Sequence, residues 1–160
     1  MTKFVLVSDS RRGRVLQLTR DSEAGTSELI ELATMVHAGR RMRPSEKFSE
    51  PRPGLRQAQR GGPVHGVDDR RDSNMDEHDR QFARDVVERA ASAIGNPAGE
   101  AVIVAASEHM LGLLRPELSR VLVDARVTEL PLNISSLTIP QIHDELSKRD
   151  LIPERGRAGM

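Results

Sequence analysis

The chain has 160 residues, enough for one domain with a full hydrophobic core, and it carries 24 basic and 24 acidic side chains. This balance leaves no overall field that would favour nucleic acid or an anionic membrane. Cysteine is absent, which excludes disulfides, thiolate metal sites and a cysteine nucleophile. The first apolar run is too short for a signal peptide, and no run approaches the roughly 18 residues of a membrane-spanning helix. We therefore expect a cytoplasmic protein without a membrane partner.

The first third of the chain has the pattern of a strand meander. Residues 4–8, FVLVS, form a continuous apolar run of the kind found in strands buried on both faces. A second strand is predicted at residues 14–19, with Gly13 in the hairpin turn before it. Residues 28–35 suit a strand or a short helix, and their position after a turn at residues 21–25 favours a third strand.

A basic stretch interrupts this regular pattern in the middle of the chain. Residues 37–75 carry nine Arg or Lys against five Asp or Glu, together with four Pro and five Gly, and show no helical or strand period. A segment of this length without regular structure is usually a functional loop or a disordered linker. We place the loop at residues 38–75 and expect any anionic partner to meet it.

A helix is predicted directly after the loop. Asn74 and Glu77 have the spacing of a capping box, and His78 would then lie at the start of the helix. Apolar residues follow at helical spacing, at Phe82, Val86, Ala90 and Ala93. The Gly-Asn-Pro sequence at residues 95–97 should end the helix.

The remaining segments alternate between strand and helix patterns. Residues 101–106 form an apolar run typical of a central parallel strand, and Ser107 can cap the helix that follows. We expect Pro116 to split or kink that helix. A fifth strand is predicted at residues 126–130, and a last helix begins near Thr138 with Pro in its first turn.

The order strand, strand, strand, helix, strand, helix, strand, helix predicts an α/β domain. It corresponds to a ribonuclease H-like mixed sheet of about five strands, with the long basic loop between the third strand and the first helix. We assign residues 1–147 to this single domain and residues 148–160 to a flexible, polar tail.

Four segments in combination resemble the bacterial host attachment family, described as proteins required for attachment to host cells. The segments are FVLVSDSRRGRVLQL, DEHDRQFARDVVERA, VIVAASEHMLGLLRPEL and VTELPLNISSL, and the resemblance covers residues 3–146. That family is similar in turn to the central domain of the archaeo-eukaryotic class-1 release factors and of Pelota. The resemblance implies a domain whose basic loop has a Gly-Gly-Gln tip that reaches the ester of peptidyl-tRNA on the ribosome.

The loop of this chain departs from that pattern at its tip. The best match is Arg60-Gly61-Gly62-Pro63, in which Pro63 replaces the glutamine and removes both the side-chain amide and a backbone N–H. Peptide release is therefore not carried over, whereas binding to the ribosome or tRNA is. The residues predicted to bind RNA are Arg40, Arg41, Arg43, Arg52, Arg56, Arg60, Gly61, Gly62, Pro63 and His65, with Asp9, Arg12, Arg14 and His78 as possible supporting residues.

Each of these features also has a simpler interpretation. Gly-Gly-Pro is common in surface turns, loop arginines are solvated in disordered segments, and a turn-forming aspartate with edge-strand charges would account for Asp9, Arg12 and Arg14.

Metal and cofactor sites are not expected. His65, His78 and His109 have acidic neighbours, but no two histidines have the spacing of a helical zinc site. A two-magnesium nuclease would need several carboxylates at strand ends. Asp9 is the one carboxylate in such a place, and Asn133 stands where the family pattern would have an aspartate. We therefore assign no catalytic residue and no cofactor.

Three functions remain open at this point. The first is a release-factor-like module that binds the ribosome or tRNA in rescue, stalling or hibernation. The second is a hydrolase of a peptidyl ester or of RNA, in which His65 or Asp68 replaces the missing glutamine. The third is an interaction protein whose loop folds onto a protein partner, so that its effect on attachment is indirect.

Overall fold

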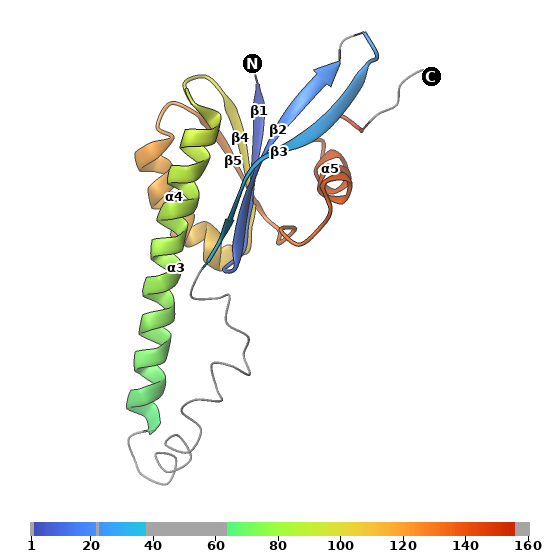
Figure 1. The fold of residues 1–160 in the computed structure, drawn as a ribbon. Coiled ribbons are helices and arrows are strands. Elements are labelled where there is room, and N and C mark those ends of the chain that lie inside the picture. The colour runs from blue at the N-terminus through green and yellow to red at the C-terminus, as the bar shows by residue number, and fades with distance from the viewer. Residues whose placement is uncertain (1, 22, 38–63, 156–160) are drawn as a thin grey trace.

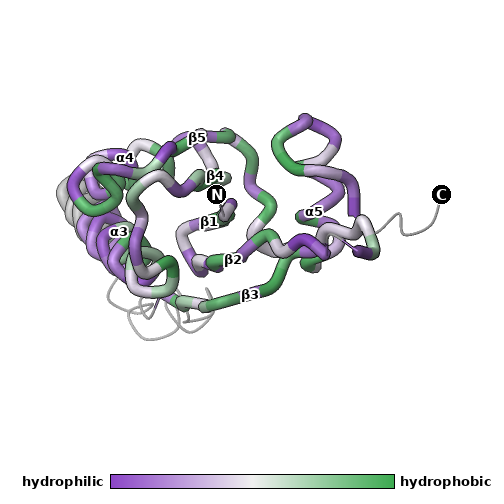
Figure 2. Tube along the Cα trace, turned by 90° about the horizontal axis from the view of Figure 1, so that it is seen from above, coloured by the Kyte–Doolittle hydropathy of each residue, from purple (hydrophilic) through white to green (hydrophobic). Residues whose placement is uncertain are grey.

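The computed structural model describes residues 2–21, 23–37 and 64–155, with the backbone alone described at residues 64–74. These residues form an α/β domain in which a five-stranded sheet lies between two layers of helix. Helices α3 (Val64–Ile94) and α4 (Glu108–Val121) cover one face, and α5 (Ile139–Ser147) lies on the other (Figures 1 and 2). The predicted α/β class is confirmed.

The sheet is mixed and open. Strand β1 (Lys3–Ser8) is central, antiparallel to β2 (Arg12–Asp21) and parallel to β4 (Ala101–Ala106). Strand β3 (Thr26–Val36) pairs antiparallel with β2, and β5 (Arg126–Pro131) pairs parallel with β4, which gives the order β3-β2-β1-β4-β5. All five predicted strands are present, and residues 28–35 belong to a strand rather than a helix.

Side chains of the central strands alternate between two hydrophobic cores, as the twofold period of a strand requires. Leu6 of β1 and Val15 of β2 face the α3 and α4 side, whereas Val5 and Val7 of β1 pack on the α5 side. Because helices cover both faces, residues 4–8 are buried without interruption, which explains the continuous apolar run in the sequence.

Helix α3 begins ten residues earlier than the predicted start at Asn74. Residues 64–75, which we assigned to the loop, are therefore helical. The sequence does not predict this part of the helix, because residues 64–73 contain only two apolar residues, Val64 and Val67, too few to define a helical period. Among the α3 side chains that the structure describes, those of residues 76–78 are exposed and that of Asp79 is the first to be buried. The helix extends past the sheet (Figure 1). The predicted end is confirmed, since Gly95 follows with a φ of 85°.

Of the two effects predicted for Pro116, a split or a kink, the split is wrong, because helix α4 runs through Pro116 without a break. Proline lacks the N–H that would bond to the carbonyl four residues earlier, at Gly112. Gly112 and Pro116 both lie on the exposed side of α4, where water can satisfy that carbonyl. At its start the helix is capped as predicted, with the Ser107 side chain accepting a hydrogen bond from the N–H of Met110.

The chain stays packed on the domain after α5. Thr138 and Gln141 form a reciprocal capping box at the start of this helix. Beyond its end, Ile152 is only 5% exposed within the second core, and Lys3 Nζ donates a 2.8 Å hydrogen bond to the carbonyl of Leu151. Packed structure thus extends past the predicted boundary at residue 148, because two apolar residues lie within an otherwise polar segment.

Candidate functional site

The carboxyl ends of four strands meet at one edge of the sheet, because β1, β3, β4 and β5 all run in the same direction. The residues that follow these strands are Asp9, His37, Ser107 and Leu132. Residues 38–63 continue from His37, so the basic segment starts at this edge (Figure 1). Ligands of open α/β sheets usually bind beyond the carboxyl ends of the strands, which makes this edge the candidate site.

Asp9 organises the turn between β1 and β2. Its Oδ1 accepts hydrogen bonds from the backbone N–H groups of Arg11, at 2.6 Å, and Arg12, at 2.8 Å. Both arginine residues are exposed. We had predicted that Gly13 lies in this turn, but it belongs to β2 and lies opposite Ser8 of β1. Asp9 thus has the simpler, turn-forming role, and its turn presents two adjacent guanidinium groups at the edge.

Arg14 clamps the segment after β5 onto the sheet. Its Nη1 donates to the carbonyls of Ser135, at 3.1 Å, and Leu137, at 2.7 Å, while its Nε donates to Glu31 at 2.9 Å. The hydrogen bond from Arg14 holds the pKa of Glu31 below its ordinary value, although partial burial acts in the opposite direction. Arg14 is 9% exposed. Its guanidinium is therefore committed to the fold and is poorly placed to bind a ligand.

The second oxygen of Asp9 joins the same clamp. Ser135 Oγ lies 2.5 Å from Asp9 Oδ2 and 3.0 Å from Asn133 Oδ1. An aspartate in place of Asn133 would put a second carboxylate next to Asp9, as a metal-dependent nuclease requires. Among the side chains that the structure describes, no three His, Asp or Glu residues are grouped so that they could hold a metal ion.

A cluster of two histidines and one aspartate lies on the α3 and α4 side of the sheet, and it could not be recognised from the sequence. Asp79 of α3 is almost fully buried, with its Oδ1 3.5 Å from His37 Nε2 and its Oδ2 3.4 Å from His109 Nε2. His37 is buried against the ring of Phe82, whose centroid is 4.8 Å away, whereas the side chain of His109 is 56% exposed. We call these three residues, His37, Asp79 and His109, the His–Asp cluster. One signal could have indicated it: Asp79 lies three residues before Phe82, on the apolar stripe of α3.

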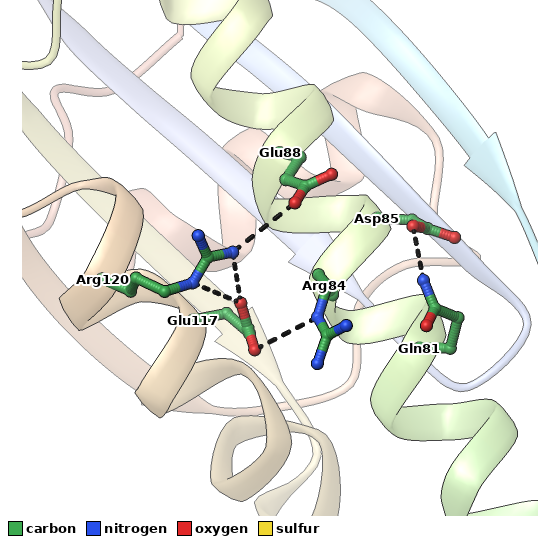
Figure 3. A network of polar contacts seen from close by, with 6 residues as sticks. All are labelled: Gln81, Arg84, Asp85, Glu88, Glu117 and Arg120. Carbon is green, nitrogen blue, oxygen red and sulfur yellow. Dashed lines mark hydrogen bonds and ion pairs between the residues drawn. The ribbon is translucent and has the colours of Figure 1, made fainter.

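Ion pairs on the outer surface hold α3 and α4 in register (Figure 3). Glu117 of α4 lies between Arg120, at 2.8 Å, and Arg84 of α3, at 3.6 Å, and Arg120 also reaches Glu88 of α3 at 3.5 Å. The hydrogen bond from Arg120 holds the pKa of Glu117 below its ordinary value. Exposed pairs add little stability individually, but this network fixes the two helices that contribute to the His–Asp cluster.

The predicted site residues are thus only partly brought together. Asp9, Arg12 and Arg14 lie at the carboxyl edge, but Arg12 alone of the three is exposed. His78 lies well inside α3 rather than at its start, with its ring 6.2 Å from that of His37. His65 is in the first turn of α3, and its side chain is not described. Arg40, Arg41, Arg43, Arg52, Arg56, Arg60, Gly61, Gly62 and Pro63 lie outside the described residues.

Comparison with known proteins identifies one matching family. A family model described as "Protein required for attachment to host cells" matches residues 4–146, which include the clamp, the His–Asp cluster and the basic segment. No curated protein matches the sequence. In the part of the chain that the structure describes, no helix is long and apolar enough to cross a membrane.

Proposed function

The chain belongs to the family of proteins required for attachment to host cells, and we propose that it acts as an RNA-binding module. It binds the ribosome or tRNA through the basic segment at residues 38–63 and through the sheet edge at which that segment starts. The effect on attachment is then indirect, through translation in the cytoplasm. This proposal does not depend on a membrane anchor or a metal ion.

The proposal rests on the uneven distribution of charge along the chain. Residues 38–63 contain seven Arg or Lys and two Glu, although the whole chain has 24 of each sign. The segment continues directly from His37, whose backbone N–H donates to the carbonyl of Arg11 at 2.8 Å. The exposed residues Arg11 and Arg12 therefore lie next to the root of the segment. A segment rich in positive charge that begins next to two exposed arginines suits binding to a phosphate backbone.

The arrangement of the sheet supports a relationship to the release factors. The order β3-β2-β1-β4-β5, with β2 antiparallel to its neighbours, is consistent with a ribonuclease H-like domain and with the central domain of those factors. Pro63 in place of the tip glutamine favours occupation of the ribosome over peptide release. We therefore propose a role in rescue, stalling or hibernation.

Sedimentation with ribosomes at about 50 and 200 mM salt tests the proposal, because binding through several phosphates weakens steeply across this range. The informative variants are Arg56→Glu with Arg60→Glu in the segment, and Arg11→Glu with Arg12→Glu at the edge. The matched control is Arg20→Glu with Arg89→Glu, two exposed positions elsewhere on the domain.

We expect salt-sensitive binding that both test variants weaken by at least about tenfold and that the control retains. Equal binding by all three variants would refute the proposal. The absence of binding by the wild-type protein at the lower salt concentration would do the same.

A second candidate function rests on the outer edge of β3. Ile30, Leu32 and Val36 are 47%, 38% and 56% exposed on this edge strand, which Figure 2 shows as a hydrophobic run. An open strand edge can pair with an extended segment of another protein. Capture of a single protein partner that resists nuclease treatment and is lost in a Leu32→Lys variant would favour this interaction function over RNA binding.

A further inference from the structure

Asp79 is an acidic residue at a buried position, which is unusual and calls for an explanation. Its side chain is only 2% exposed on the buried face of α3, among residues of the first hydrophobic core. Burying a carboxylate is costly unless hydrogen bonds or opposite charges compensate. Its two oxygens face two different imidazole rings, one buried and one exposed.

His109 is the exposed member of the His–Asp cluster. It lies in the first turn of α4, two residues after Ser107, whose hydroxyl caps the helix and fixes its start. Its Nε2 lies 3.4 Å from Oδ2 of Asp79. For the mechanism proposed below we place the ring hydrogen on Nε2, which leaves the lone pair of Nδ1 to accept a proton. With more than half of the side chain exposed, the ring is accessible from solvent. An imidazole oriented by a buried carboxylate is the arrangement of a general base.

The cluster is continuous with the exposed arginine turn. His37 contacts Asp79 through its ring and the Arg11 carbonyl through its backbone N–H. The chain of contacts therefore runs from the turn at Arg11, through His37 and Asp79, to His109. His78, on the exposed side of α3, has its ring near that of His37. The arginine turn and the cluster thus lie at the same carboxyl edge and are joined through His37.

We propose that this edge cleaves RNA, with His109 as the catalytic general base and Asp79 as its positioning residue. His109 Nδ1 removes the proton of a ribose 2′-hydroxyl, and the 2′ oxygen forms a bond to the adjacent phosphorus. The bond from phosphorus to the 5′ oxygen breaks, and that oxygen takes a proton from water. The products are a 2′,3′-cyclic phosphate and a 5′-hydroxyl end, and His109 returns its proton to solvent. The reaction needs no cofactor, and it does not need the missing glutamine.

This inference rests on the proposed binding of RNA, but it makes a separate claim. The simpler alternative is that His109 ties the start of α4 to α3 without taking part in chemistry. If His109 is only a structural contact, its replacement would lower the stability of the protein. If it is a general base, its replacement would lower the rate of cleavage and leave the affinity for RNA unchanged.

The test uses the full-length protein and a 5′-labelled, mixed-sequence RNA of about 20 nucleotides, with the 2′-O-methyl form of the same RNA as an uncleavable ligand. Binding is measured by fluorescence anisotropy on the methylated RNA, and cleavage on the unmodified RNA. The variants are His109→Gln, His109→Ala and Asp79→Asn. The matched control is Glu108→Gln, which removes an ionisable group from the same exposed turn. Circular dichroism establishes that each variant is folded.

We expect cleavage of the unmodified RNA only. The rate should fall by at least about 100-fold in His109→Gln, because a general base contributes a factor of this size. It should fall at least about tenfold in kcat for Asp79→Asn at unchanged affinity, and stay within about threefold of wild type in Glu108→Gln. Added imidazole should restore cleavage by His109→Ala, which a purely structural residue would not show.

Binding of the methylated RNA without cleavage of the unmodified RNA would overturn the inference and leave the proposed function standing. Cleavage that persists in His109→Gln would overturn it as well. A protein that binds neither RNA would remove the proposed function and this inference together.

Discussion

Replacing Gly13 by alanine tests how closely α3 approaches the sheet. Gly13 lies in β2, on the face covered by α3, and has no side chain there. A Cβ at this position would lie 2.9 Å from Cγ2 and 3.2 Å from Cγ1 of Val86, and 3.3 Å from Cε of Met35. Carbon atoms in contact are ordinarily about 3.5–4.0 Å apart. The helix or the valine must therefore move to admit one methyl group.

The expected cost follows from two opposing effects. Overpacking of a close-packed core costs about 1–3 kcal/mol, and the loss of chain freedom in the unfolded state returns about 0.4–1 kcal/mol. We expect Gly13→Ala to lower the free energy of unfolding by about 1–2 kcal/mol. Gly112→Ala is the matched control, because a Cβ there meets nothing within 4 Å. It should raise the free energy of unfolding by about 0.5–1 kcal/mol, as for an exposed position within a helix.

A double-mutant cycle with Val86→Ala identifies the clash. Removing the valine methyls alone should cost about 2–3 kcal/mol through lost burial and a residual cavity. In the Gly13→Ala, Val86→Ala double variant the new methyl occupies part of that cavity, so the total should be smaller than the sum by about 1 kcal/mol or more. Urea denaturation measures all four proteins. Additive costs, or a Gly13→Ala protein as stable as wild type, would refute the close approach.

Three further outcomes test the clamp and the start of α4. Arg14→Met should lower the free energy of unfolding by roughly 2–4 kcal/mol, because it leaves two carbonyls without their donor and removes the guanidinium from Glu31. Arg20→Met, at an exposed position, should change it by less than about 0.5 kcal/mol, and equal effects in urea denaturation would contradict the clamp. The pKa of Glu31 is lowered in the folded state, so its contribution to stability is present above the ordinary pKa of a glutamate and is lost as the pH falls through the lowered value. Glu31→Gln should therefore flatten the decline in melting temperature below about pH 4.3. An unchanged decline would count against the Arg14–Glu31 pair. Ser107→Ala should cost about 1 kcal/mol through loss of the helix cap, measured by thermal denaturation, and a variant as stable as wild type would show that the cap contributes nothing.

The fold was largely predictable because its strands and most of its helices carry strong local patterns. A continuous apolar run, as at residues 4–8, reports burial on both faces, and a capping serine with an apolar stripe reports the start of α4. The predictions were wrong where the structure depends on features that the local sequence pattern does not show. Residues 64–73 of α3 contain only two apolar residues, Val64 and Val67, too few to define a helical period in the sequence. Pro116 is tolerated because the carbonyl that it deprives of a donor is exposed.

The candidate site was less predictable, because its residues come from five separate segments of the chain. Asp9 and Arg14 were recognised, but whether they face a ligand or the protein interior depends on the segment after β5, more than 120 positions away. His37 and Asp79 could not be paired from sequence, since residues 38–63 separate the elements that carry them. In addition, the pattern at Asn74 placed Asp79 at the start of a helix, where an acidic residue needs no further explanation.

Substitutions in the clamp and substitutions in the exposed turn would be interpreted differently in a mutational study of the carboxyl edge of the sheet. Substitution of Asp9 or Arg14 would loosen the turn and the segment after β5 together, so that loss of RNA binding in such a variant would report a disturbed edge rather than a lost contact. Arg11 and Arg12 are held by their backbone N–H groups and keep their side chains in solvent. Charge reversal at Arg11 or Arg12 leaves the backbone of the turn intact and changes only the charge that the turn exposes to solvent. Under the proposed function, a change in RNA affinity on charge reversal of these two arginines would therefore report direct contact.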